Sequence, residues 1–131
     1  MRKTLIESIK LKKYILKWPF ECLSTRMKQA LNTMVCIHDP KFDKHISREL
    51  KERGMWEPTN IRSFLNLLND LNDTNVIDVG ANIGVYSLFA AKLGRNVIAV
   101  EPLHENLNRL HKAAQLEGRV PNSKIYIDFF Y

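Results

Sequence analysis

The pattern of apolar and polar positions changes character near residue 75. Before that point, apolar residues recur at spacings of three and four, which is the period of an amphipathic helix. After it, short continuous apolar runs alternate with helical stretches in the order β-α-β-α-β. That order is typical of a parallel sheet with right-handed crossovers. The sequence therefore predicts helices in the first half and an α/β fold in the second.

Two of the predicted helices lie before residue 36. The first covers residues 4–17 and ends at Trp18, because a residue that precedes a proline avoids the helical conformation. The second is predicted from apolar residues spaced four, four and three apart. They are Leu23, Met27, Leu31 and Met34.

Two more helices are predicted between residues 43 and 71. Asp43 is the expected N-cap of a short helix that runs through Ile46 and Leu50 and closes at Gly54. Thr59 or Asn60 is the expected cap of the next helix. That helix carries an apolar stripe formed by Ile61, Phe64, Leu65, Leu68 and Leu71.

The second half is predicted to hold three strands and two helices. The strands cover residues 76–79, 96–100 and 124–130, and the helices cover 85–93 and 104–116. Gly94 and Gly118 are the expected C-terminal ends of the two helices. The middle strand is a continuous apolar run, so we expect both of its faces to be covered.

Charge is distributed unevenly along the chain. The formal net charge is +6, and residues 1–60 hold 13 Lys/Arg against 7 Asp/Glu, whereas residues 61–131 hold 7 of each. The basic helix predicted at 4–17 either packs on the domain or contacts an anionic membrane surface. A nucleic-acid partner is not expected, because no basic stripe is interleaved with aromatic residues. No run is long enough to span a membrane and no secretory signal is present, so a cytoplasmic location is the expectation.

The chain contains cysteines and other side chains that can bind metals, but their spacing matches no known disulfide framework or metal site. Two cysteines without a C-x-x-C pair do not make a disulfide framework, so free and partly buried thiols are expected. Residues 36–45 hold five side chains of ligand type in a spacing that matches no metal site, and Pro40 prevents a shared helix face. We therefore predict no metal. The five residues are Cys36, His38, Asp39, Asp43 and His45.

The stretch VIDVGANIG joins the first predicted strand to the helix after it. The strand ends in Asp78, and the turn has Gly80 and Gly84 with Ala81 and Asn82 between them. Such a turn lies at the carboxyl edge of a parallel sheet, where ligands of doubly wound folds bind. Gly80 permits close ligand approach, and Gly84 lets the helix start close against the strand. Unpaired N–H groups at the helix start favour an anionic group.

A second acidic residue, Glu101, ends the next strand in the stretch VIAVEP. Its carboxylate has two oxygens that can accept hydrogen bonds from both hydroxyls of a ribose. The turn glycines and this acid together indicate a nucleoside pocket. A dinucleotide is disfavoured, because Gly80 and Gly84 do not fit G-x-G-x-x-G and Asp78 would repel a pyrophosphate. This argues against a nicotinamide-dependent oxidoreductase and favours S-adenosylmethionine, which carries a sulfonium and an ammonium but no phosphate.

The motif DVGANIG resembles the first motif of class I S-adenosylmethionine-dependent methyltransferases, with Asn82 replacing the usual middle glycine. The longer stretch VIDVGANIGVYSLFAAKLGRNVIAVEPLHENLNRL resembles the FkbM family of methyltransferases. In that family the asparagine is usual, and so is a later E-P-x-x-x-N motif, here at 101–106. The segment GMWEP at 54–58 also resembles the family's segment before the first strand. The resemblance covers roughly residues 46–131.

The resemblance implies a role for each matching residue. Asp78 and the loop from Gly80 to Gly84 would hold the methionine part of the cofactor, with Asp78 binding the ammonium. Glu101 would bind the ribose hydroxyls, and Pro102 would flank the adenine.

Four further residues receive less definite roles from the same resemblance. Leu103 would flank the adenine beside Pro102, and Glu57 would line the same pocket. Asn106 would steady the turn that follows the second strand. Asp128 either reaches the adenine or faces solvent.

The resemblance also implies a fold and a function. The fold is a Rossmann-like class I methyltransferase sheet of about seven strands, of which three are present, so an incomplete domain at 46–131 is expected after an N-terminal helical segment at 1–45. The acceptor-binding and catalytic segments would be missing. The chain is then either a truncated product or a short natural form. His104 and His111 are the nearest bases by type, but no catalytic residue is nominated.

Two functions remain open at this stage. The first is methyl transfer from S-adenosylmethionine, expected to reach a hydroxyl of a small molecule or sugar, with a chain that is inactive alone. The second is a non-catalytic binding or interaction protein that keeps only the nucleoside-pocket half. The acceptor is not specified, because a fold and pocket ancestry do not determine it.

Overall fold

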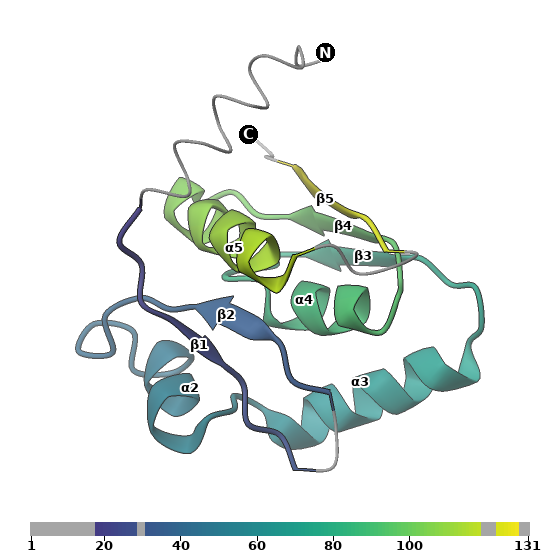
Figure 1. The fold of residues 1–131 in the computed structure, drawn as a ribbon, viewed down its shortest axis with the longest axis horizontal. Helices are drawn as coiled ribbons and strands as arrows, with labels where there is room; N and C mark the ends of the chain where they lie inside the picture. Colours follow the sequence, from purple (N-terminus) through teal and green to yellow (C-terminus); the bar gives the residue numbers. More distant parts are fainter. Residues whose placement is uncertain (1–17, 29–30, 119–122, 129–131) are drawn as a thin grey trace.

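The computed structural model describes residues 18–28, 31–118 and 123–128 (Figure 1). Its centre is a three-stranded parallel sheet in the order β3 (Val76–Val79), β4 (Val97–Val100) and β5 (Ile125–Asp128). Helix α4 (Val85–Lys92) connects β3 to β4, and α5 (His104–Glu117) connects β4 to β5. The predicted β-α-β-α-β order is confirmed. The predicted helix at 4–17 lies outside the described residues, and so do residues 129 and 130 of the third predicted strand.

Both crossover helices cover the same face of the sheet. The strands follow one another in sequence order, and right-handed crossovers in a constant direction place every connecting helix on one side. Residues that alternate with the buried ones are therefore exposed, because no described element packs on the other face. The large apolar side chains on that face are Ile77 at 67% exposure, Val79 at 79%, Ile98 at 43% and Tyr126 at 56%.

The expectation that the middle strand is covered on both faces is wrong. Val97 and Ala99 of β4 are fully buried against the helices, whereas Ile98 between them is largely exposed. A continuous apolar run shows that both faces of a strand can tolerate burial. Whether helices cover both faces depends on the order of the strands in the sheet, which here is β3-β4-β5.

The second predicted helix is also wrong, because its residues form an antiparallel hairpin. Strand β1 (Cys22–Ser24) pairs with β2 (Met34–Cys36), with Cys22 opposite Cys36. The helical spacing was coincidental, since Met27 is buried but Leu31 is exposed. The pairing extends beyond the strands through backbone hydrogen bonds from Thr25 to Thr33 and from Ile37 to Glu21.

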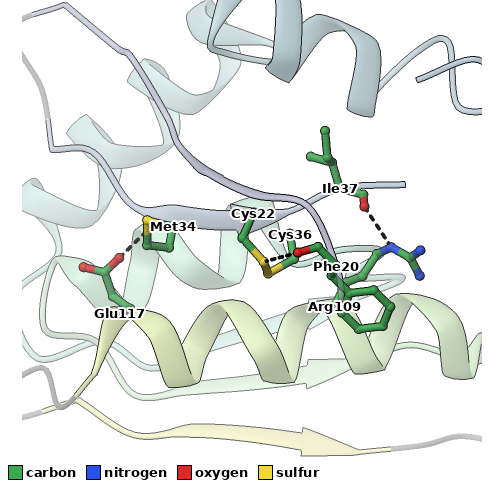
Figure 2. The surroundings of a disulfide bond; sticks show 7 residues. All are labelled: Phe20, Cys22, Met34, Cys36, Ile37, Arg109 and Glu117. Atoms are coloured by element: carbon green, nitrogen blue, oxygen red, sulfur yellow. Dashed lines mark hydrogen bonds between the residues drawn. A yellow bond between two sulfur atoms is a disulfide. The ribbon is translucent and has the colours of Figure 1, made fainter. Parts of the chain in front are cut away.

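A disulfide joins the two cysteines, so the expectation of free thiols is wrong (Figure 2). Cys22 and Cys36 are direct cross-strand partners with Cα atoms 3.9 Å apart. The bridge lies where the hairpin packs on α5, and Cys36 is fully buried there. Arg109 of α5 donates from Nε to the carbonyl of Ile37 at 3.1 Å, and its guanidinium lies 4.4 Å from the Phe20 ring centre. Burial lowers the pKa of Arg109, although Glu105 opposes that shift.

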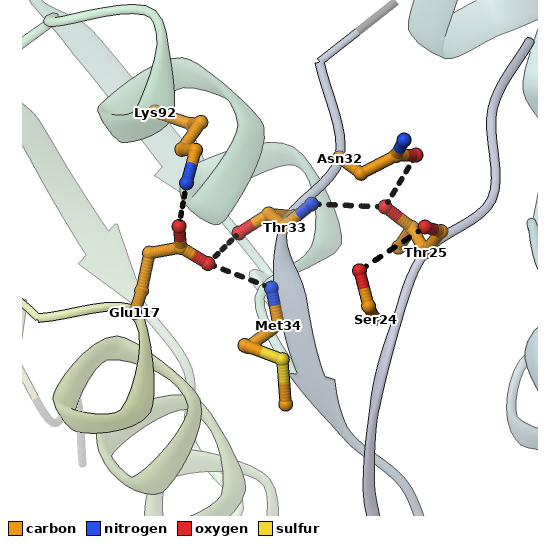
Figure 3. A network of polar contacts seen from close by, with 7 residues as sticks. All are labelled: Ser24, Thr25, Asn32, Thr33, Met34, Lys92 and Glu117. Carbon is orange, nitrogen blue, oxygen red and sulfur yellow. Dashed lines mark hydrogen bonds and ion pairs between the residues drawn. The ribbon is translucent and has the colours of Figure 1, made fainter.

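The hairpin is bound to both crossover helices through one carboxylate (Figure 3). Glu117, the last residue of α5, accepts hydrogen bonds from the Thr33 hydroxyl at 3.1 Å and from the Met34 N–H at 2.8 Å. Its other oxygen forms an ion pair with Lys92 of α4. The hydrophobic core is likewise continuous, because Val35 belongs to the same buried cluster as the residues of α4 and α5. The hairpin and the α/β unit therefore share one core.

Helix α2 (Ser47–Arg53) begins later than predicted, because Ile46 rather than Asp43 occupies the cap position, and Ile46 has no side-chain capping bond. The Asp43 carboxylate accepts hydrogen bonds from the N–H groups of Ile46 at 3.2 Å and Ser47 at 2.9 Å. Burial raises the pKa of Asp43, but hydrogen bonds from Ser47, Ile46 and His45 outweigh it, so the net pKa lies below 3.8. Gly54 ends the helix with a positive φ of 80°, as predicted.

Helix α3 (Pro58–Asp70) begins earlier than predicted. Pro58 is its first residue and Glu57 is the cap position, with a positive φ of 47° and no side-chain capping bond. The expected caps, Thr59 and Asn60, lie inside the helix, because a proline suits the first helical turn. The predicted apolar stripe faces the core except for Leu71, which is exposed. No helix of the described residues is long and apolar enough to cross a membrane.

Candidate functional site

The candidate site lies at the carboxyl ends of β3 and β4, where the sequence places it. The loop from Gly80 to Gly84 follows β3 directly, and Glu101 follows β4. Because Val79 and Val100 are paired in register, the loop and Glu101 leave the sheet side by side. The two stretches singled out by sequence are thus brought together.

The loop backbone uses three left-handed residues. Gly80, Asn82 and Gly84 have φ values of 78°, 53° and 88°. A Cβ on Gly80 would meet no atom within 4 Å, so the space beside this residue is open to a ligand. A Cβ on Gly84 would lie 2.2 Å from Cδ1 of Leu110. Gly84 therefore permits close approach to α5, and the expected close contact with the strand is not the reason for this glycine.

The N–H groups of the loop already have acceptors within the protein. Gly80 and Ala81 both donate to the Val100 carbonyl, at 2.8 and 3.0 Å. Asn82 donates to Glu101, Ile83 to the Asn82 side chain, and Gly84 to the Ala81 carbonyl. An anionic ligand group would therefore have to use the first turn of α4, whose N–H groups have no acceptor within the helix.

Glu101 is a buried carboxylate, 4% exposed, that links the two loops. Its Oε2 accepts a hydrogen bond from the Asn82 N–H at 2.8 Å. Its Oε1 accepts from the Leu103 N–H at 2.9 Å and the Asn106 amide at 3.2 Å. A carboxylate offers about four acceptor positions, so one remains on Oε2. The geometry leaves room for one ribose hydroxyl without rearrangement, rather than for two.

Sequence reasoning did not connect His38 to this site. His38 follows β2, and its Nε2 lies 2.7 Å from Oδ1 of Asn106, whose amide in turn donates to Glu101. The Asn106 oxygen can only accept, so Nε2 of His38 carries the proton in this arrangement. A chain of hydrogen bonds therefore runs from the hairpin to the buried carboxylate. Local sequence contained no signal for it, because the partners come from separate elements.

Asp78 points toward α4, where Oδ2 accepts a hydrogen bond from the Ser87 hydroxyl at 2.7 Å. Next to Ser87, the Tyr86 hydroxyl donates to Glu57 at 3.0 Å. Burial raises the pKa of Tyr86 to about 12, and the hydrogen bond to Glu57 and the charges of Glu57 and Asp78 contribute. Glu57 and Asp78 therefore lie close to the same phenol, although they are distant in sequence.

The three carboxylates around the loop share one electrostatic feature. Within the described ranges, neither Glu57, Asp78 nor Glu101 forms an ion pair with a lysine or arginine. Two of them are held by neutral hydroxyl donors and the third by N–H groups. The environment around the β3–α4 loop is therefore negative, which suits a cationic ligand and disfavours a phosphate.

A cavity of about 590 Å³ opens beside the residues that bond to Glu101. Its lining includes Asn82 and Asn106, which both bond to Glu101, and Leu103, which is exposed. Phe42, which sequence reasoning passed over, also lines it. The complete lining is His38, Phe42, Asp43, Asn82, Leu103, His104, Glu105 and Asn106.

The remaining sequence candidates lie at different distances from the cavity. Pro102 is exposed at the turn after β4. His104 reaches the cavity, whereas His111 lies further along α5 and is not among the lining residues. The Asp128 side chain lies outside the described part of the structure.

Within residues 18–28, 31–118 and 123–128, no group of three or more His, Cys, Asp and Glu side chains could hold a metal ion. Members of the 36–45 set have other partners: Cys36 is in the disulfide, His38 bonds to Asn106, and Asp43 accepts hydrogen bonds from Ser47.

No protein-family model, curated protein or solved structure matches this chain in the three comparisons made.

Proposed function

We propose that this chain binds S-adenosylmethionine and forms the cofactor-binding part of a methyltransferase. The observation that carries the proposal is a set of three carboxylates around a glycine turn at the carboxyl edge of a parallel sheet, none of which pairs with a cation among the described residues. A ligand with a sulfonium, an ammonium and a ribose offers positive charges and hydroxyl donors to these three carboxylates. A dinucleotide would bring its pyrophosphate to the same acids.

Each residue has a role in this proposal. Asp78 and Glu57 attract the ammonium beside Tyr86, and the open space next to Gly80 admits the methionine chain. Glu101 accepts a ribose hydroxyl at its remaining acceptor position, fixed in place by Asn82 and two further donors. The adenosyl group extends into the cavity beside Glu101.

When bound, the cofactor supplies an electrophilic methyl group for displacement by a nucleophile, here a hydroxyl of a small molecule or sugar. The protein contributes by holding the ligand in a fixed orientation, which lowers the entropic part of the barrier. No described residue is assigned as the base that accepts the proton of the acceptor.

Calorimetric titration of the full chain with S-adenosylhomocysteine tests the proposal. We expect saturable binding that is weakened about tenfold or more in Asp78→Asn and in Glu101→Gln, because each change removes a charge or an acceptor while keeping shape. Asp70→Asn, at the exposed end of α3, is the matched control and should bind like the wild type. Circular dichroism confirms that each variant is folded.

The same titration with NAD separates the alternatives. A folded wild-type chain that binds neither ligand would contradict the proposal and favour the non-catalytic interaction protein. That second candidate draws support from the uncovered apolar face of the sheet. Binding of NAD in preference to S-adenosylhomocysteine would favour an oxidoreductase.

A further inference from the structure

The cavity beside Glu101 has an apolar part built from two separate segments. Phe42 comes from the turn between β2 and α2, and Leu103 comes from the loop between β4 and α5. These side chains are 86% and 61% exposed, which is unusual for large apolar groups that line one cavity. A flat apolar ligand bound there would remove both from water.

The turn that carries Phe42 is held rigidly. The carbonyl of Asp39 accepts hydrogen bonds from the N–H groups of Phe42 and Asp43, each at 3.0 Å, and its side chain accepts from Lys41 at 2.9 Å. The Asp43 carboxylate then accepts a hydrogen bond from the N–H of Ser47, the first residue of α2, and Arg48 donates back to the Pro40 carbonyl. An exposed aromatic ring on a fixed turn binds a ligand with little loss of conformational entropy, because its backbone is already ordered.

The charges in the cavity narrow the class of ligand. Asp43 and Glu105 are acidic, and no lysine or arginine is among the described lining residues. A phosphate would be repelled there. The amides of Asn82 and Asn106 and the imidazole of His38 offer the donors and acceptors that the edges of a heterocyclic base require. The lining thus fits an uncharged nucleoside better than a nucleotide.

We propose that Phe42 stacks on the adenine ring of the bound ligand and that the acidic lining excludes phosphorylated nucleosides. This inference rests on the proposed function and adds to it a binding residue from the N-terminal hairpin segment. Stacking of a base on an aromatic side chain contributes enough to change affinity by about tenfold or more. The cavity adjoins the proposed ribose position, because Asn82 and Asn106 both bond to Glu101 and line the cavity.

Titration of the full chain with S-adenosylhomocysteine, adenosine and AMP tests this inference. We expect Phe42→Ala to weaken binding of the first two ligands about tenfold or more, and Phe42→Trp to restore it. Tyr126→Ala removes another exposed aromatic side chain, 56% exposed and outside the cavity, and should leave affinity unchanged. AMP should bind less tightly than adenosine, and Glu105→Gln should reduce that difference, because it removes one of the repelling charges.

The outcomes separate this inference from the function on which it rests. Wild-type binding of S-adenosylhomocysteine with equal affinity in Phe42→Ala would overturn the stacking role and leave the proposed function standing. AMP binding as tightly as adenosine would overturn the selection against phosphate. A folded wild-type chain that binds no S-adenosylhomocysteine would remove the proposed function, and this inference with it. Because Phe42 is 86% exposed, its replacement is not expected to impair folding.

Discussion

Three carboxylates near the β3–α4 loop have different hydrogen-bond donors, although they belong to the same chemical class. Glu101 is buried and accepts hydrogen bonds from three N–H donors. Asp78 and Glu57 each accept a hydrogen bond from a hydroxyl group on α4. The consequence is clearest at Tyr86, which donates to Glu57 and lies near both acids. Burial raises the pKa of Tyr86 most, and its ionisation would also break the hydrogen bond to Glu57 and place a third negative charge beside the two acids.

The raised pKa of Tyr86, about 12 compared with 10.0 for an ordinary tyrosine, gives a prediction about pH. The stabilisation from its proton is complete below pH 10 and is lost as the pH rises from 10 to 12. Absorbance titration at the tyrosinate band should therefore show one tyrosine that ionises later than the others, and this late component should be absent in Tyr86→Phe. Ionisation of every tyrosine near pH 10 in the folded chain would contradict the prediction.

At the scale of the elements, helix α4 is packed on several sides. Six of its eight residues are buried, because it contacts the sheet, α3, α5 and β2. Its first turn therefore has to start close to α5, and Gly84 provides the space beside Leu110. Gly80, at the other end of the same loop, is left-handed as well but faces open space.

The two glycines should respond differently to alanine. Gly84→Ala combines a left-handed alanine with a clash against buried Leu110, so we expect a loss of about 2–5 kcal/mol in unfolding free energy. Gly80→Ala carries only the backbone strain, about 1–2 kcal/mol, but it should weaken S-adenosylhomocysteine binding, because the new methyl group occupies the open space. Urea unfolding together with ligand titration measures both. Equal losses of stability would show that the Leu110 contact is unimportant.

The hairpin gives a second prediction at this scale. The disulfide closes a loop with a sequence separation of 14, for which the expected stabilisation is about 3 kcal/mol. A Cys22→Ser/Cys36→Ser variant, or the wild type in reductant, should unfold at a correspondingly lower urea concentration. Thiol titration of the denatured, unreduced chain should detect no free thiol. Two reactive thiols under those conditions would contradict the cross-strand bridge.

For the whole molecule, the main feature is the asymmetry of the sheet. Helices cover one face of the sheet, and the hairpin packs on the outer side of those helices (Figure 1). The other face exposes apolar side chains. In the described part of the chain, β3 pairs only with β4, so its other edge also lacks a partner strand. An exposed apolar face beside an unpaired edge favours association with another chain.

We therefore expect the chain to self-associate as its concentration rises. Ile77→Lys combined with Ile98→Lys, at positions 67% and 43% exposed on the uncovered face, should reduce this association without lowering stability greatly. Leu67→Lys, on the exposed side of α3, is the control and should not change it. Sedimentation velocity over a range of concentrations provides the measurement. A wild-type chain that stays monomeric throughout would show that the exposed face is tolerated.

The sequence by itself determined the α/β half of the molecule. Strands at 76–79 and 97–100, the intervening helices and their glycine ends follow from local periodicity and backbone preference, which act within a few residues. The position of Asp78, the glycine loop and Glu101 at one sheet edge also followed, because parallel strands place their carboxyl ends together. The predicted cap at Asp43 was only partly right: its carboxylate bonds to the Ser47 N–H, but Ile46 holds the cap position of α2.

Only the tertiary structure decided the rest. The hairpin formed in place of a predicted helix, because cross-strand pairing and packing on α5 outweighed the preference indicated by four apolar residues at helical spacing. The roles of His38, Phe42 and Tyr86 depend on partners far away in the chain, which no local pattern encodes. The strand order β3-β4-β5 decided that the connecting helices cover only one face of the sheet. These features arise from contacts between distant segments, and such contacts exist only once the chain has folded.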